Sequence, residues 1–90
     1  MSTKTIEIFT GPNCAYCESA KALLDRKGVV YREYDVSADP QHLEEFSRRL
    51  PRTRAIPQIF VDGEHIGSWE DLQHLESNGR LAETIGAAGG

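Results

Sequence analysis

Apolar and polar residues alternate in two stretches of the chain and follow a helical period between them. Residues 3–9 mix β-branched and aromatic residues with polar ones, which predicts a strand, and residues 29–36 predict another. The intervening residues carry apolar side chains at helical spacing, and we expect a helix whose inward face is Cys17, Ala20, Leu23 and Leu24. Strand, helix and strand in so short a span predict a right-handed unit with parallel strands.

The second half begins with another helix. Asp39 as N-cap and Pro40 in the first turn predict its start, and its apolar stripe is Leu43, Phe46 and Leu50. Pro51 ends this helix, and a basic loop follows.

A hairpin and short helices complete the chain. Residues 56–61 read as an apolar strand, and Asp62-Gly63 predicts a tight turn into an antiparallel strand over residues 64–66. Ser68 and Asp71 form a helix-start pattern, and residues 80–85 predict a last short helix. This order of strands and helices predicts an α/β fold with a four-stranded mixed sheet and helices on both faces. We expect one domain over residues 1–85 and a flexible tail over residues 86–90.

Composition limits the class of protein. The chain has 90 residues, 39% hydrophobic and 27% charged, and a formal net charge of −4, as expected of one soluble domain. No apolar run reaches membrane-spanning length, and no N-terminal signal segment is evident. We therefore expect a cytoplasmic protein without membrane association. The acidic balance argues against nucleic acid as its partner.

The two cysteines of the chain, Cys14 and Cys17, form a C-x-x-C motif where the first strand turns into the first helix. Unpaired N–H groups and the helix dipole favour negative charge at that end, so we expect the Cys14 thiolate to be stabilised. Cys17 lies one turn further on, on the same face and deeper. A reactive sulfur backed by a second thiol is what thiol–disulfide exchange needs.

Other interpretations of the motif are weaker. A zinc site would need further ligands, and His42, His65 and His74 are not paired at short spacing, so we expect them on the surface and expect no metal site. A structural disulfide across so short a loop would constrain the unfolded chain little. Pro57 opens an apolar strand, and composition leaves open whether it is an edge proline or a cis proline in a functional turn.

Three stretches in this order resemble glutaredoxins of the dithiol, C-x-Y-C type. They are residues 14–17 (CAYC), 54–60 (RAIPQIF) and 66–72 (IGSWEDL). The resemblance implies a thioredoxin-like fold and glutathione-dependent reduction of protein disulfides and glutathionylated proteins. In this interpretation Cys14 is the nucleophile and Cys17 the resolving thiol. It also implies that Pro57 is cis and that the Ile56 backbone pairs with the peptide part of glutathione.

The resemblance also implies a glutathione site, made of Tyr16, Arg54, Ile56, Pro57, Trp69, Glu70 and Asp71. Arg54 would face a glutathione carboxylate, and Asp71 or Glu70 the γ-glutamyl ammonium. The alternatives are a solvated loop charge for Arg54 and a helix cap for Asp71. The chain departs from the family at Gly11, where a lysine is common, and at Ser68, where a second glycine is common; Trp69 and Glu70 also differ.

An iron–sulfur carrier is the alternative function. Ala15 stands where the family often has proline, and related proteins without that proline can hold a [2Fe-2S] cluster between two subunits. Two Cys14 thiolates and two glutathiones would be the ligands. We expect a monomer otherwise, and a dimer when a cluster is bound.

Overall fold

The protein is built on a four-stranded mixed sheet in the order β2-β1-β3-β4. The structure, a computed structural model, describes residues 4–86. β1 (Ile6–Thr10) pairs in parallel with β2 (Tyr31–Asp35) and antiparallel with β3 (Gln58–Val61), and β3 pairs antiparallel with β4 (Glu64–Gly67). The predicted sheet is therefore confirmed. Residue 3 of the first predicted strand and residues 87–90 of the predicted tail lie outside the described part.

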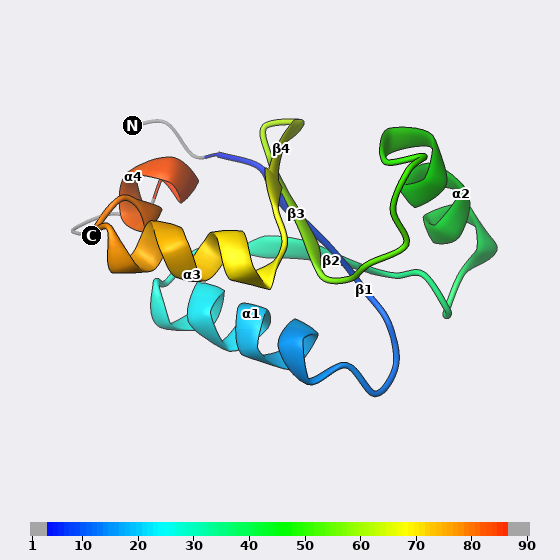
Figure 1. The fold of residues 1–90 in the computed structure, drawn as a ribbon, viewed down its shortest axis with the longest axis horizontal. Helices are drawn as coiled ribbons and strands as arrows, with labels where there is room; N and C mark the ends of the chain where they lie inside the picture. Colours follow the sequence, from blue (N-terminus) through cyan, green and yellow to red (C-terminus); the bar gives the residue numbers. More distant parts are fainter. Residues whose placement is uncertain (1–3, 87–90) are drawn as a thin grey trace.

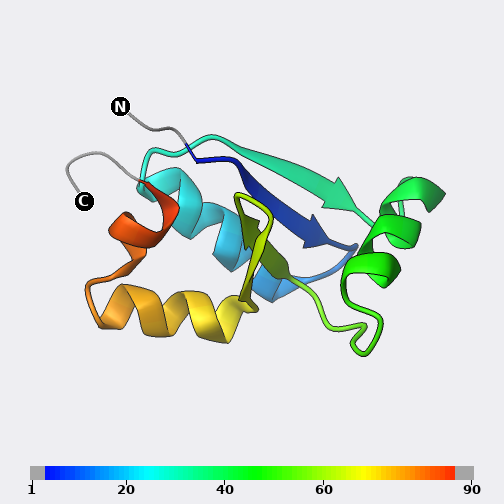
Figure 2. The ribbon, with the colours of Figure 1, turned by 90° about the horizontal axis from the view of Figure 1, so that it is seen from above.

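Three helices cover one face of the sheet, and the fourth packs against the other face at one end. α1 (Ala15–Arg26) and α3 (Trp69–Ser77) run side by side on one face, and α4 (Leu81–Ile85) follows α3 (Figure 1). α2 (Pro40–Arg49) stands at one end of the sheet, apart from the other helices (Figure 2). Alternation along β1 sends Ile8 toward α1 and Phe9 toward the opposite side. The larger core contains Ile6, Ile8, Leu23, Leu24, Ile59 and Leu72, and the smaller core is Phe9, Phe46 and Phe60.

Local signals place the start of α2 and the hairpin turn as predicted. The Asp39 carboxylate accepts the Gln41 N–H at 2.9 Å and caps α2, whose first residue is Pro40. The hairpin turns through Asp62 and Gly63, with φ of 52° and 82°. Both values lie in the left-handed region that Asp-Gly turns require.

Two apolar positions differ from the prediction. Val30 precedes β2 and is 88% exposed, and Leu43 on α2 is 42% exposed. α2 contacts the end of the sheet, so its contribution to the core is a single buried side chain, Phe46. The expected stripe was therefore wrong at Leu43.

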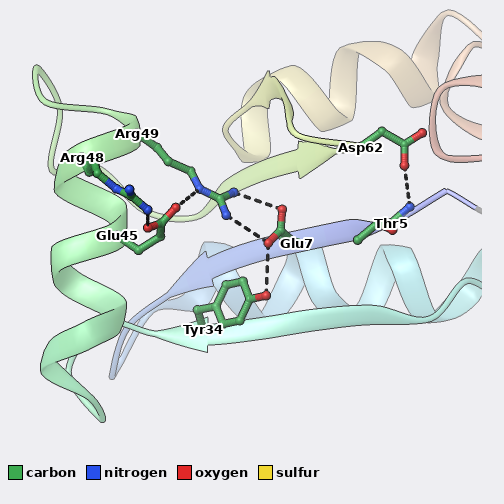
Figure 3. Close-up of polar contacts among 7 residues, drawn as sticks. All are labelled: Thr5, Glu7, Tyr34, Glu45, Arg48, Arg49 and Asp62. Carbon is green, nitrogen blue, oxygen red and sulfur yellow. Dashed lines mark hydrogen bonds and ion pairs between the residues drawn. The ribbon is translucent and has the colours of Figure 1, made fainter.

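An ion pair attaches the last turn of α2 to the sheet (Figure 3). Arg49 donates to both carboxylate oxygens of Glu7, at 3.0 and 3.2 Å, and the Tyr34 hydroxyl donates to Glu7 at 3.1 Å. The Arg49 guanidinium also lies over the Phe60 ring, 4.9 Å from its centroid. A polar and cation–π contact replaces part of the apolar stripe that we expected.

Candidate active site

Cys14 is the N-cap residue of α1, as predicted. Asn13, with φ of 52°, turns the chain, and Cys14 itself is extended at φ −114° and ψ 102°. Its sulfur accepts the Cys17 N–H at 3.2 Å, and its carbonyl oxygen accepts the Glu18 N–H at 3.2 Å. A partly exposed sulfur thus takes the place of the usual capping oxygen, at the positive end of the helix dipole.

Cys17 differs from Cys14 by its burial. Its side chain is fully buried at the base of the motif, and both cysteines are free thiols. Burial, followed by the contact with the Cys14 sulfur, raises the pKa of Cys17 to about 12. The backbone of Gly11 and the charge of Lys21 act in the opposite direction. Cys17 is therefore a protonated, shielded thiol beside an accessible one.

The Ile56-Pro57 peptide bond is cis, which the residues alone left open and the family resemblance implied. Pro57 is buried, and Ile56 is partly exposed beside it. Gln58, which is buried, donates its side-chain N–H to the Ala55 carbonyl oxygen at 3.0 Å. The Gln58 side chain therefore spans and holds the turn that presents the Ile56 backbone.

His65 completes this support, which the sequence did not reveal. Its Nε2 lies 2.7 Å from Gln58 Oε1, and its ring packs against Phe60 at a centroid distance of 5.1 Å. His42 contacts the Asp35 carbonyl oxygen at 3.0 Å through Nδ1 and is half-buried. The spacing of the histidines gave no sign of these partners, and of the two only His65 is exposed on the surface as expected. His74 is exposed, as expected.

A cleft of about 220 Å³ lies between the motif, the cis-proline turn and the start of α3. Five of the predicted glutathione-site residues line it, namely Tyr16, Ile56, Pro57, Trp69 and Glu70. Tyr16 is 64% exposed and does not contribute to the core. Trp69 lines the cleft and also packs against the larger core.

The cleft does not include Arg54 or Asp71 among its lining residues. Arg54 is exposed on the loop before Ile56. The Asp71 carboxylate accepts the Ser68 N–H at 2.9 Å and the Ser68 hydroxyl at 3.2 Å, and thus caps α3. Gly67 has φ of 134°, and a Cβ there would overlap Asp71. The cap at residues 67–71 therefore depends on this glycine.

Two further residues, Ser68 and Gln73, line the cleft. Sequence reasoning gave Ser68 a capping role and missed Gln73. The signal for Gln73 is its spacing, because it follows Trp69 by four residues and so shares its helix face.

Two negative findings apply to the described residues. Residues 4–86 contain no group of three or more His, Cys, Asp or Glu that could hold a metal ion. Within the same range, the helices are too short or too polar to cross a membrane.

Comparisons with known proteins agree with this geometry. The Glutaredoxin family model matches residues 6–66. The chain is 46% identical over 82 residues to glutaredoxin 1 of Rickettsia typhi, covering 90% of this chain and 79% of that protein.

Solved structures show the same fold. The solution structure of glutaredoxin from Brucella melitensis superposes with a TM-score of 0.78 at 41% identity, covering 94% of this chain and 91% of that one. The buckwheat glutaredoxin–glutathione complex superposes with a TM-score of 0.80 at 22% identity, covering 93% and 81%. The thioredoxin-like fold expected from the motifs is therefore confirmed.

Proposed function

The chain belongs to the glutaredoxin family of thiol–disulfide oxidoreductases, and we propose that glutathione is its reductant. The observation that carries the proposal is the cysteine pair: an accessible sulfur at the α1 N-terminus beside a buried thiol. The glutathione complex of the buckwheat protein supports the choice of reductant, since the two folds correspond.

Cys14 is the nucleophile in this proposal. Its thiolate attacks the glutathione sulfur of a mixed disulfide, forming a Cys14–glutathione disulfide while the substrate leaves as a thiolate that takes up a proton. The thiolate of a second glutathione attacks the glutathione sulfur of that adduct. The products are glutathione disulfide and the restored Cys14 thiolate. The Cys17 N–H remains directed at the Cys14 sulfur and stabilises its negative charge in both steps.

Cys17 acts with protein disulfides. Cys14 first forms a mixed disulfide with one substrate sulfur, and the second substrate sulfur leaves. Cys17 then loses its proton and attacks the Cys14 sulfur, which releases the substrate and leaves a Cys14–Cys17 disulfide. Glutathione reduces this disulfide. Because burial raises the pKa of Cys17 to about 12, we expect this resolving step to be slower than the first attack near neutral pH.

The cleft is our proposed glutathione site. The peptide part would pair with the Ile56 backbone beside Pro57, with Tyr16 and Trp69 as the walls. Glu70 would face the γ-glutamyl ammonium, with Asp71 behind it at the cap. Arg54 does not line the cleft, and its pairing with a glutathione carboxylate stays a prediction.

Two cysteine variants test the function. Cys14→Ser should abolish turnover of a glutathione mixed disulfide. Cys17→Ser should retain that turnover and slow the reduction of a protein disulfide. Both rates are measured by coupling glutathione disulfide formation to glutathione reductase. The opposite pattern, with Cys17→Ser inactive and Cys14→Ser active, would reverse the assignment.

A cluster-binding dimer remains the alternative. A single chain would supply Cys14 alone, because Cys17 is buried, so a partner subunit's thiolate and two glutathiones would have to complete the ligand set. Anaerobic purification with glutathione followed by gel filtration distinguishes the two functions. A coloured dimer would favour the carrier, and a colourless monomer that turns over mixed disulfides would favour the enzyme.

A further inference from the structure

Lys21 lies on the same face of α1 as Cys17, one helical turn further on. Helical side chains lean toward the N-terminus of their helix, so the Lys21 side chain extends back toward the turn that contains Cys17. Its ion pair with Glu18, at 3.0 Å between Nζ and Oε2, agrees with this direction, because Glu18 directly follows Cys17. The positive charge of Lys21 is therefore placed beside the turn that carries the buried thiol.

Two residues of the sheet hold the Lys21 ammonium in this place. Lys21 Nζ donates to Glu33 Oε2 at 3.0 Å, and the Thr10 hydroxyl donates to the same oxygen at 2.8 Å. Thr10 is buried at the end of β1, and the Lys21 side chain is only 20% exposed. Hydrogen bonds to Glu18 and Glu33 raise the pKa of Lys21 above its ordinary value. Lys21 is therefore a fixed cation that stays charged wherever thiols exchange.

The same end of β1 contacts the Cys17 thiol, because Gly11 follows Thr10 and touches that thiol through its backbone. Burial and the contact with Cys14 raise the pKa of Cys17 to about 12, while the Gly11 backbone and the charge of Lys21 act against them. Once Cys14 is bonded to a substrate sulfur, it carries no charge and no longer opposes ionisation of Cys17. Burial then disfavours the Cys17 thiolate, and Gly11 and Lys21 favour it.

The other charged groups near the motif include carboxylates. Glu18 and Glu33 hold the Lys21 ammonium, and Glu70 of α3 lines the cleft. Each of these carboxylates disfavours a thiolate in its neighbourhood, and the first two offset part of the Lys21 charge. We therefore expect Lys21 to have a moderate effect on Cys17.

We propose that Lys21 is a positioning residue of the resolving step, and that its fixed positive charge favours the Cys17 thiolate while Cys14 is bonded to a substrate sulfur. Cys17 gives its proton to water, its sulfur attacks the Cys14 sulfur, and the bond between Cys14 and the substrate breaks. The Cys14–Cys17 disulfide forms, and the substrate leaves as a thiolate that takes up a proton. The inference rests on the proposed function, because it concerns the resolving role of Cys17.

A neutral aromatic disulfide separates the two steps. Dithiodipyridine, mixed with an excess of reduced protein, reacts first with Cys14 and then with Cys17, and each step releases a coloured thiopyridone. Stopped-flow absorbance resolves a first phase, whose rate depends on protein concentration, and a second phase, whose rate does not. The second phase therefore reports the attack of Cys17 on Cys14 within one molecule.

Lys21→Met should slow the second phase about three- to tenfold at neutral pH, because it removes a charge one helical turn from Cys17. The first phase should stay within about twofold, since Cys14 depends on the end of the helix dipole. Lys21→Arg keeps the charge and should restore the second phase to within about twofold of its natural rate. From pH 6 to 8 the second phase should accelerate in parallel in the natural chain and in Lys21→Met, because the thiolate is the attacking form.

Lys27→Met supplies the matched control. Lys27 follows the last residue of α1, pairs with Glu76 at 2.8 Å and has a side chain that is 24% exposed, close to the value for Lys21. It lies at the far end of the helix from the motif, so both phases should keep their natural rates. If Lys21→Met leaves the second phase unchanged, or if Lys27→Met slows it equally, the inference is wrong.

Circular dichroism checks that each variant folds. Lys21→Gln, which keeps a hydrogen-bond donor for Glu33, is a second neutral variant and should also slow the second phase; a natural rate in folded Lys21→Gln would overturn the inference. A natural chain that lacks either phase would instead overturn the proposed function, because Cys14 or Cys17 would then lack the role given to it.

Discussion

At the scale of single residues, one sulfur and its surroundings decide the chemistry. Cys14 and Cys17 are three residues apart, yet one is partly exposed and accepts an N–H, while the other is fully buried. The difference arises because Cys14 precedes the first helical residue, whereas Cys17 lies on the inward face of α1. Two side chains of the same type therefore have different roles.

His65 offers a prediction at this scale. His65→Ala removes the partner of Gln58 Oε1 and should loosen the turn before Pro57, because the other end of Gln58 holds Ala55. We expect KM for a glutathione mixed disulfide to rise about two- to tenfold, the equivalent of one hydrogen bond, with kcat within about twofold. Steady-state kinetics measures both constants.

His65→Gln is the control for this prediction, because its amide can still donate to Gln58. It should restore most of the lost affinity. A variant pair with equal KM values would show that the hydrogen bond at residue 65 does not position the turn.

At the scale of elements, many of the side-chain hydrogen bonds and ion pairs lie at the ends of helices. The Cys14 sulfur caps α1, the Asp39 carboxylate caps α2, and Ser68 and Asp71 together cap α3. The last turn of α2 is held by Arg49, which bridges to β1 (Figure 3). The caps could be predicted from neighbouring residues, and the bridge joins residues 42 positions apart.

The α3 cap separates two roles of neighbouring acids. Asp71→Ala should lower the free energy of unfolding by about 0.5–2 kcal/mol, since two donors of Ser68 lose their acceptor. Glu70→Ala should change it by less than about 0.5 kcal/mol, because Glu70 is exposed. Urea unfolding monitored by circular dichroism measures both. A larger loss for Glu70→Ala than for Asp71→Ala would contradict this assignment.

The Glu7–Arg49 ion pair predicts that the free energy of unfolding depends on pH. Hydrogen bonds from Arg49 hold the pKa of Glu7 below its ordinary value of about 4.3. A carboxylate with a lowered pKa stabilises the fold above that ordinary value, and the stabilisation is lost as the pH falls through the pKa of the folded state. Glu7→Gln should therefore be less stable than the natural chain at pH 6–7, by about 1.5–3 kcal/mol, and approach it near pH 3.

Urea midpoints from pH 3 to 7 measure this difference. Glu44→Gln, at an exposed glutamate of α2, is the matched control and should follow the natural chain at every pH. If the urea midpoints of Glu7→Gln and the natural chain differ by the same amount at every pH, ionisation of Glu7 does not control the stability.

At the scale of the whole molecule, the sheet separates two unequal cores. The larger core lies under α1 and α3, and the smaller one is a cluster of three phenylalanines near α2. The cysteine motif, the cis-proline turn and the start of α3 come from distant parts of the chain and meet at one cleft. Trp69 at the start of α3 packs against the larger core, and Ile56 of the turn packs against the smaller one, so we expect the stability of the molecule and the integrity of the cleft to be linked.

Two leucines test this distribution. Leu24→Ala, in the larger core, should lower the free energy of unfolding by about 2–5 kcal/mol because it leaves a cavity. Leu43→Ala, at a residue that is 42% exposed on α2, should change it by less than about 0.5 kcal/mol. Urea unfolding gives both values. Comparable losses for the two variants would mean that α2 packs more closely than the structure shows.

Local rules were sufficient for most of the fold. Strand alternation, the caps at Asp39 and Ser68 and the Asp62-Gly63 turn depend on residues close together in the chain, so they could be predicted. The position of Cys14 at a helix start follows from the same short-range signals. The isomer of Pro57 could not be predicted from composition, and it came from the family resemblance.

Tertiary packing decided the remainder. The exposure of Leu43, the Arg49 bridge and the support of the cis-proline turn by His65 all depend on how distant segments meet. A periodic pattern indicates which side of a helix is apolar. It does not indicate how much of that side another element covers, because coverage depends on the placement of whole helices and strands in space.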